Sequence, residues 1–301
     1  MNLLDLESHG TTIALLPVCL IGALLNWTVV YSIHNMATFK HAFGFLSANQ
    51  ATADALHSTL FLIYFCPMVL LDVKLMKEYS DFAGFFMTFC YELSILTHFV
   101  ISLNRFCAVF LPFHYQRIFS ETNTKRMILG LWMFTGTVAL VCYAYLCRVY
   151  YEETTQFFYF TNTEFCGLMA WYGDFVKNAA IVILIVLIDL ATVCKVRQIS
   201  KKIASSTSED RQHRFSRREM RFLKQTVFQG AVFLLELSTY FFIPKYTQNK
   251  WIVFLATSFA WVSVHAADGI VVMICNPEIR KFVVTQGKVT HLEQTSQCST
   301  K

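Results

Sequence analysis

The stretch "SLNRFCAVFLPFHY" at residues 102–115 places a charged side chain at the end of a long apolar run. Asn104 and Arg105 close that run, Pro112 stands seven residues after the arginine, and Tyr115 stands ten after it. A guanidinium group is costly inside a hydrocarbon layer, so an arginine kept at this place indicates a function and not a filler residue.

Other ionisable side chains also fall within apolar runs, where each of them is costly unless it has a partner. A metal-dependent hydrolase would need clustered histidine and carboxylate ligands. The histidines here stand singly on three different segments, which favours single hydrogen bonds between helices. The acids Glu92, Asp189 and Glu236 receive no role from the sequence. Such side chains include Asp54, Glu92, Asp189, Glu236, Asp268, His57, His98 and His265.

Composition sets the elements that must hold these side chains. The chain has 301 residues, of which 55% are hydrophobic and only 15% charged, too few for the surface of a soluble domain of this length. Apolar runs of about 20 residues are long enough to cross a bilayer as helices. We predict an all-α bundle of seven such spans in one domain, residues 1–285, with a short helix after the last span and a tail at 286–301. The spans are 11–33, 45–68, 82–104, 127–147, 172–194, 225–243 and 251–275.

The basic residues predict the orientation of the bundle. With the N-terminus outside, the inner segments hold 19 Lys and Arg residues and the outer segments hold six. Inner loops carry such an excess, so we expect the N-terminus outside and the C-terminus inside. The net charge of +5 is then explained by topology and by contact with anionic lipid, and nucleic acid is not an expected partner. The first ten residues lack a basic start, so no cleaved signal peptide is expected.

Seven helices in this orientation leave three classes of protein: a G-protein-coupled receptor, a retinal protein, and a membrane enzyme or transporter. A retinal protein needs a lysine in the last span for its Schiff base, and residues 251–280 contain none. A transporter usually shows paired halves and broken helices, and no internal repeat is evident.

Four motifs in order resemble those of rhodopsin-like receptors. The first span holds "GALLNWTVV", with Asn26 and with Val29 three residues on, and the second span holds "NQATAD" at 49–54, similar to Asn-x-Ala-x-Ala-Asp. The third span ends in Asn104-Arg105-Phe106 where that group has Asp/Glu-Arg-Tyr. Span seven ends in "DGIVVMICNPEIR", which is similar to Asn-Pro-x-x-Tyr followed by Asn-x-Glu-Phe-Arg. The stretches "WYGDFVKN", "FLKQTVFQG" and "ELSTYFF" narrow the resemblance to the nematode serpentine chemoreceptors of class X, over about residues 20–285.

This resemblance implies a chemosensory G-protein-coupled receptor in the plasma membrane of sensory neurons. Its partners would be a small extracellular ligand, membrane lipids and a heterotrimeric G protein, and it would not be an enzyme. Coupling to the G protein is expected to use Asn104, Arg105, Pro112 and Tyr115. Two alternatives stay open, a seven-helix scaffold or trafficking protein that does not signal and a multi-pass membrane enzyme.

The motifs also depart from the pattern of the receptors they resemble. Asn104 cannot hold a charge, so Arg105 must find neutral acceptors or a partner elsewhere. Val272 stands in place of the span-seven tyrosine, and span six lacks Trp-x-Pro, with Glu236 and Leu237 near that place. The usual activation relay is therefore not transferred residue by residue.

The resemblance implies a water or sodium pocket formed by Asn26, Asp54, Ser94 and Asp268. Two carboxylates a few ångströms apart cannot both ionise cheaply in a medium of low dielectric. We therefore expect either a bound sodium ion between them or a shared proton. The alternative is that each side chain makes a separate hydrogen bond between helices. No other cofactor and no metal centre is expected.

The disulfide usual in such receptors joins helix three to the second outer loop, but the helix-three position here is Ser80. Cys147 and Cys166 instead flank an 18-residue loop rich in Tyr, Phe and Thr, which suits a two-stranded hairpin. Both face the oxidising side in the predicted topology, so we expect them to be bonded to each other. Cys66 is the alternative partner for Cys166.

The expected ligand pocket is lined by Met87, Tyr91, Trp171 and Tyr240. Met87 stands where the amine-binding aspartate of similar receptors would fall, so an amine held by that contact is disfavoured. Such a lining suits a small lipophilic or weakly polar odorant.

Overall fold

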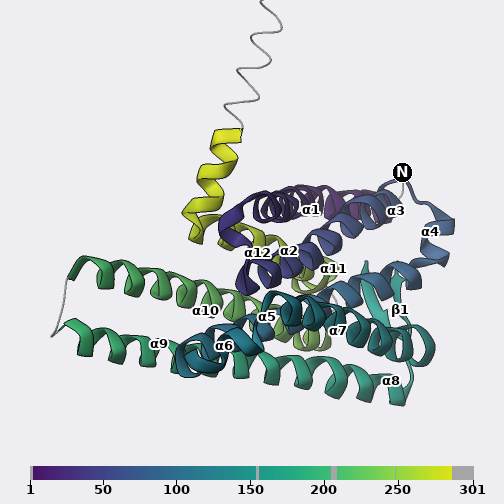
Figure 1. Ribbon diagram of the computed structural model, residues 1–301. Helices are drawn as coiled ribbons and strands as arrows, with labels where there is room; N and C mark the ends of the chain where they lie inside the picture. The colour runs from purple at the N-terminus through teal and green to yellow at the C-terminus, as the bar shows by residue number, and fades with distance from the viewer. Residues whose placement is uncertain (1–2, 154–155, 205–208, 248, 287–301) are drawn as a thin grey trace, which may run out of the picture.

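The computed structural model describes residues 3–153, 156–204, 209–247 and 249–286, and these residues are helical almost throughout (Figure 1). Seven helical segments in this part of the chain are long and apolar enough to cross a membrane. Each of them overlaps one predicted span, with ends that differ by at most eight residues, which confirms the seven-helix fold. The segments are Gly10–Asn35, Ala42–Leu70, Ser80–Phe110, Glu121–Leu146, Glu164–Ile199, Gln225–Tyr246 and Lys250–Cys275.

The bundle is built around α5, which packs against α2 on one side and α9 on the other (Figure 1). Helix α12 closes the arrangement by packing against α1, α2 and α10. The bounds of the spanning elements are α1 Leu3–Asn35, α2 Ala42–Leu60, α3 Cys66–Leu70, α5 Ser80–Phe110, α7 Glu121–Ala139, α9 Lys177–Ala204, α10 Glu209–Tyr246, α11 Lys250–Phe254 and α12 Ala260–Cys275. Short helices at Lys74–Glu78 (α4) and Pro112–Ile118 (α6) connect spans, and Glu164–Leu168 (α8) is the first part of span five.

The distribution of polar side chains is inverted relative to a water-soluble bundle. Ile13 and Leu24 on α1 are 64% and 59% exposed, whereas Asn26 on α1 and Asp54 on α2 are each 1% exposed. Apolar surface outside and hydrogen-bonded polar groups inside suit a helix bundle surrounded by lipid, where no water pairs with exposed polar groups. The chain is thus a multi-pass membrane protein. The polar segment "SANQATADALHS" of span two is compatible with this because its polar side chains face neighbouring helices.

Four of the spans contain a short stretch of wider π-helical turns. These stretches are η2 Phe61–Phe65, η3 Leu140–Leu146, η4 Met169–Val176 and η5 Leu255–Phe259. A π-helical turn inserts an extra residue and rotates the residues that follow it around the helix axis. The stretch η4 therefore decides which side chains at the start of span five face the interior. A separate short 3₁₀ turn, η1 Ala37–Phe39, links α1 to α2.

A β-hairpin covers one end of the bundle, which we call the hairpin end. Strands β1 Val149–Glu152 and β2 Phe157–Phe160 pair antiparallel, with Val149 opposite Phe160. A disulfide joins Cys147 and Cys166 on either side of the hairpin, with 5.5 Å between the Cα atoms. Cys66 is buried and makes no disulfide. Tyr151 donates its backbone N–H to Ser80 Oγ over 3.1 Å, so a hydrogen bond ties helix three to the hairpin.

The backbone of the hairpin lies directly on α5. A Cβ atom built on Gly84 would stand 2.0 Å from the carbonyl oxygen of Val149, so only glycine fits at this contact. Phe158 on β2 is fully buried, and its ring packs near those of Phe61, Phe65 and Trp261 on the helices. The hairpin therefore serves as a fixed cover over the interior.

The opposite end of the bundle, which we call the Arg105 end, holds α6 and a further helix at 277–286. The predicted short helix after span seven is thus present, and it is amphipathic because Ile279 is buried while Arg280 is exposed. The N-terminus lies at the hairpin end and helix 277–286 at the other (Figure 1). Which end faces the cell exterior stays a prediction.

Candidate functional site

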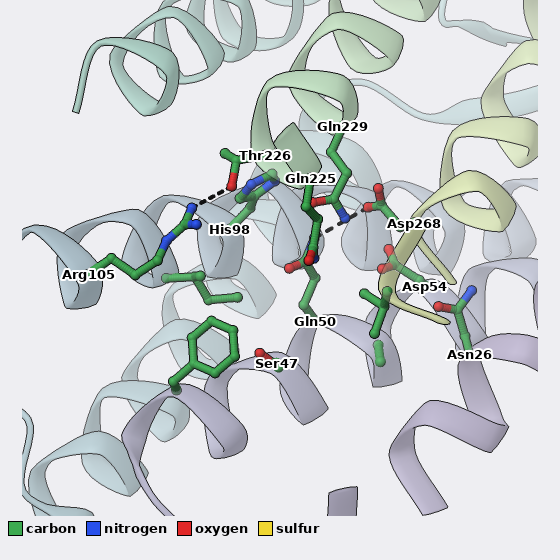
Figure 2. A pocket seen from close by; sticks show the side chains of 14 residues that line it. Asn26, Ser47, Gln50, Asp54, His98, Arg105, Gln225, Thr226, Gln229 and Asp268 are labelled. Atoms are coloured by element: carbon green, nitrogen blue, oxygen red, sulfur yellow. Dashed lines mark hydrogen bonds between the residues drawn. The ribbon is translucent and has the colours of Figure 1, made fainter. Parts of the chain in front are cut away.

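Arg105 has a charged partner that the sequence did not reveal. Its Nη2 donates to Asp189 Oδ2 on α9 over 2.9 Å, and it also donates to Thr226 Oγ1 on α10. Ser102 Oγ donates to the same carboxylate oxygen over 3.1 Å. The side chains of Arg105 and Asp189 are only 11% and 3% exposed. The ion pair joins α5 to α9, and Thr226 adds α10, so three helices meet at one guanidinium group. Figure 2 shows the contact between Arg105 and Thr226.

The neighbouring Asn104 faces another way. Its Nδ2 donates to the Tyr115 hydroxyl over 3.3 Å, and the Tyr115 ring stacks on Phe119. Pro112 begins α6, which carries Tyr115 beside α5. Asn104 and Tyr115 therefore form a neutral contact between α5 and α6, and Pro112 begins α6, while Arg105 lies apart from them with α9 and α10.

The side chains expected to form an ion or water pocket do come together. Ser94 Oγ donates to Asp54 Oδ1 over 2.6 Å, and Gln50 Nε2 donates to Asp268 Oδ2 over 3.3 Å. Asn26 Nδ2 donates to the backbone carbonyl of His265 over 2.9 Å. A Cβ on Gly269 would stand 2.8 Å from Asn26 Oδ1, so the glycine allows α1 and α12 to approach.

Two histidines join this pocket, although the sequence placed them on separate spans without paired spacing. His265 Nδ1 lies 2.8 Å from Asp54 Oδ1, and both side chains are almost fully buried. The ring of His57 lies against that of His265, with 3.8 Å between the ring centres. The described residues contain no group of three His, Cys, Asp or Glu side chains that could hold a metal ion.

One interior cavity contacts both the carboxylates and Arg105. Asn26, Asp54 and Asp268 line one part of it, and Arg105 and Thr226 line another (Figure 2). It offers about 20 Å³ to the centre of a water-sized sphere, which is room for about one water molecule. Gln50, Gln225 and Gln229 line the stretch between, so a polar path joins the Asp54 pocket to the Arg105 ion pair.

A second cavity lies beneath the hairpin. Of the four residues expected to line a ligand pocket, Tyr91 and Tyr240 do so. Met87 is fully buried in the apolar core, and Trp171 stacks on Phe175, so the structure does not bring these two to the cavity. Asp174 and Glu236 are the lining residues that sequence reasoning missed, and the available signal was an acid within an apolar run.

Glu92 has a structural partner close to this cavity. Lys177 Nζ lies 2.5 Å from Glu92 Oε1, and Asn178 Nδ2 donates to the same oxygen over 3.3 Å. The Tyr143 hydroxyl lies 3.4 Å from it. This cluster neutralises Glu92 and ties α5 to α9 and to the end of span four.

A smaller ion-pair cluster lies in the loop at the hairpin end. Lys77 Nζ lies 2.5 Å from Asp72 and 2.6 Å from Glu153 in the hairpin. The hydrogen bond from Lys77 holds the pKa of the Asp72 carboxyl below its ordinary value. Burial raises the pKa of the Tyr151 hydroxyl in β1.

The arrangement of seven spans, an arginine at the end of the third and a covered interior cavity defines a seven-transmembrane protein of the rhodopsin-like fold. Squid rhodopsin superimposes on this chain with a TM-score of 0.77 at 16% sequence identity, covering 95% of this chain and 87% of the rhodopsin. That likeness establishes the fold alone.

The family follows from sequence similarity. Residues 16–276 match the family described as "Serpentine type 7TM GPCR chemoreceptor Srx", and the chain belongs to this family. It is 27% identical over 279 residues to serpentine receptor class X 45 of Caenorhabditis elegans, covering 87% of this chain and 77% of that protein. It is 29% identical over 276 residues to serpentine receptor class X-43 of the same organism, covering 88% and 83%. The resemblance to nematode class X receptors is thereby confirmed.

Proposed function

We propose that this protein is a chemosensory receptor of the plasma membrane of sensory neurons. In this proposal the hairpin end faces outward and receives a small ligand, and the Arg105 end activates a heterotrimeric G protein. Membership of a chemoreceptor family supports a receptor and not an enzyme. The observation that carries the proposal is the Arg105–Asp189–Thr226 contact, because it joins three helices at the end opposite the hairpin cavity.

The contact provides an element that can exist in two states. In the structure, Arg105 holds α9 and α10 against α5. A movement of α9 and α10 away from α5 would break the contacts to Asp189 and Thr226 and leave the guanidinium able to donate to backbone carbonyls of a G-protein segment. A ligand activates such a receptor only by binding the open arrangement more tightly than the closed one.

The pocket between the two ends is proposed to hold a sodium ion or a shared proton. Asp54 and Asp268 line the same cavity, and His265 lies against Asp54. If a sodium ion binds there, ligand affinity should change with sodium concentration, and Asp54→Asn should remove that dependence. If ligand affinity is independent of sodium in the unmodified receptor, a proton shared with His265 accounts better for the buried carboxylates.

Nucleotide exchange on reconstituted heterotrimeric G proteins tests the proposal directly. Purified receptor in nanodiscs would be exposed to a panel of odorants, with Arg105→Ala and Arg105→Lys beside the unmodified chain. We expect Arg105→Ala to abolish ligand-driven exchange while surface expression and ligand affinity change by less than a few fold. Full signalling by Arg105→Lys would show that the arginine serves only to anchor span three at the membrane interface. The low exposure of the Arg105 side chain, 11%, argues against that anchoring role.

A non-signalling scaffold is the second candidate, favoured by the neutral Asn104 and by Val272 in place of a tyrosine. It predicts no exchange with any ligand that demonstrably binds. Orientation is tested separately by epitope tags after Met1 and after Lys301. We expect only the first tag to be labelled on intact cells.

A further inference from the structure

The cavity beneath the hairpin carries two carboxylates that make no ion pair with any described residue of the receptor. Asp174 comes from η4 and Glu236 from α10, and both line the same small space. They are 8% and 4% exposed, so each side chain is more than nine-tenths buried. A buried carboxylate is unfavourable unless it gains a proton or a cation.

The polar contacts of these two acids are few. Asp174 accepts one hydrogen bond from Asn178 Nδ2 over 2.7 Å. Among the described residues, the Glu236 carboxylate reaches only the Tyr91 hydroxyl, at 3.5 Å, which exceeds the usual length of such a bond. Within the described part of the chain, neither acid makes an ion pair, because Lys177 is engaged with Glu92. Glu236 is thus a buried carboxylate that lines the cavity with almost no hydrogen-bond partner.

The remaining walls of the cavity are aromatic. Tyr91, Tyr240 and Trp261 line it together with the acids. Aromatic faces attract cations, and a desolvated carboxylate attracts them more strongly still. A neutral apolar ligand would leave both acids buried without a partner, whereas an ammonium group would offset one negative charge and donate hydrogen bonds to both acids, with a single proton held on the second acid.

The dimensions of the site further restrict the ligand. The acid-lined cavity offers about 20 Å³ to the centre of a water-sized sphere, which suits an ammonium head group and nothing larger. A second space of about 350 Å³ lies between the hairpin and the end of α10. Phe160, Tyr240 and Phe241 line both spaces and form the boundary between them. The outer space is the size of a small-molecule pocket and can hold an apolar body.

We propose that the receptor binds a primary amine with an apolar body, whose ammonium group lies between Asp174 and Glu236 and whose body occupies the outer space between the hairpin and the end of α10. The inference rests on the proposed function and names the class of its ligand. It places the cation on spans five and six, away from Met87 on span three, where the sequence disfavoured an amine contact. Lys245 lines the outer space, but its ammonium lies over the Trp171 ring, 5.1 Å from the ring centre.

Matched pairs of amines and alcohols test the charge requirement on the full chain purified in nanodiscs. The probes are hexylamine with hexan-1-ol and 2-phenylethylamine with 2-phenylethanol, and binding is measured from the shift in the thermal unfolding midpoint with probe concentration. We expect at least one amine to bind about tenfold or more tightly than its alcohol, as a charge-assisted hydrogen bond requires.

Glu236→Gln and Asp174→Asn should each remove that preference. Glu164→Gln, an exposed acid in α8, should retain it. Equal binding of amine and alcohol, or an amine preference that survives both substitutions, overturns the proposal.

A labelling experiment decides the case in which none of these probes binds. Thr88 lines the cavity, and Thr88→Cys introduces a thiol beside both acids. The thiol is treated with cationic aminoethyl methanethiosulfonate and with neutral methyl methanethiosulfonate, and each rate is normalised to that of free cysteine. Mass spectrometry of the modified peptide separates this thiol from the native ones.

We expect the cationic reagent to react about tenfold faster after normalisation, and we expect that advantage to fall in a variant that also carries Glu236→Gln. A ratio near one shows that the acids carry no charge, and a thiol that neither reagent reaches shows that the cavity is closed. Either outcome overturns the proposal. Neither experiment contains a G protein, so loss of nucleotide exchange would refute the proposed signalling function without affecting this result.

Discussion

Asp189→Asn isolates the ion pair that holds α5 to α9. The substitution keeps the size of the side chain and removes its charge, so Arg105 loses its anionic partner while Thr226 remains. Breaking a well-buried ion pair typically costs about 3–5 kcal/mol. Arg105 is 11% exposed and lines a cavity with room for water, which can replace part of the lost contact. We therefore take the loss as about 2 kcal/mol, within the range of a charge-assisted hydrogen bond.

This loss applies to the closed arrangement only, because the ion pair is the contact that an opening movement would break. A change of about 2 kcal/mol multiplies the ratio of open to closed receptor by about 30. A resting open population of about 1% would then rise to about 20%. Basal nucleotide exchange should increase accordingly, and amide hydrogen exchange in residues 225–237 of α10 should become faster without ligand.

Two further variants make the measurement decisive. Glu121→Gln breaks the exposed Glu121–Lys125 pair at the same end of the bundle, where both side chains are about 60% exposed, and it should change neither readout. Thr226→Val removes the neutral contact and should produce a smaller rise of the same sign. If Asp189→Asn leaves both basal exchange and amide exchange at the level of the Glu121→Gln control, the ion pair does not hold the closed state.

Three other expectations concern separate parts of the molecule. Asn104→Asp should leave basal activity almost unchanged, because Asn104 contacts Tyr115 and Arg105 already has an acid; a large fall in basal exchange would contradict this. Cys147→Ser, alone or with Cys166→Ser, should lower surface expression to the same extent, and additive losses in the double variant would mean that the thiols act independently. Gly84→Ala should lower surface expression and thermal stability by displacing the hairpin, whereas Gly130→Ala, at a position with open space, should not.

The seven spans could be predicted from the sequence because each is a continuous apolar run, and the motifs fixed their order. The Asp54 pocket was also within reach, since Asp54, Ser94 and Asp268 lie on motifs with known helix faces. The partner of Arg105 was not, because Asp189 lies 84 residues away and only the packing of α9 against α5 brings them together. Sequence spacing within one helix carries no information on the register between two helices.

The position of Asp174 at the cavity could not be predicted because of its local backbone conformation. It lies within η4, where π-helical turns change the angular position of each residue relative to a regular helix. A regular helical pattern therefore gives the wrong face for this stretch. The contact between His57 and His265 was missed because each histidine stands alone in its own span, and pairing by sequence spacing cannot detect a contact across α2 and α12.

At both ends of the bundle, acids that similar receptors carry on the third helix lie here on spans five and six. In the receptors that this chain resembles, the third helix supplies an acid next to the arginine and, where an amine binds, an acid in the ligand pocket. Here those places on α5 are taken by Asn104 and Met87, which carry no charge. The carboxylates stand instead on spans five and six, as Asp189 at the Arg105 end and as Asp174 and Glu236 at the hairpin end. A cation bound between Asp174 and Glu236 would contact spans five and six directly, and these two spans also supply Asp189 and Thr226 to Arg105. In this receptor the ligand would therefore act on the same pair of helices that holds the arginine, without a relay through the third.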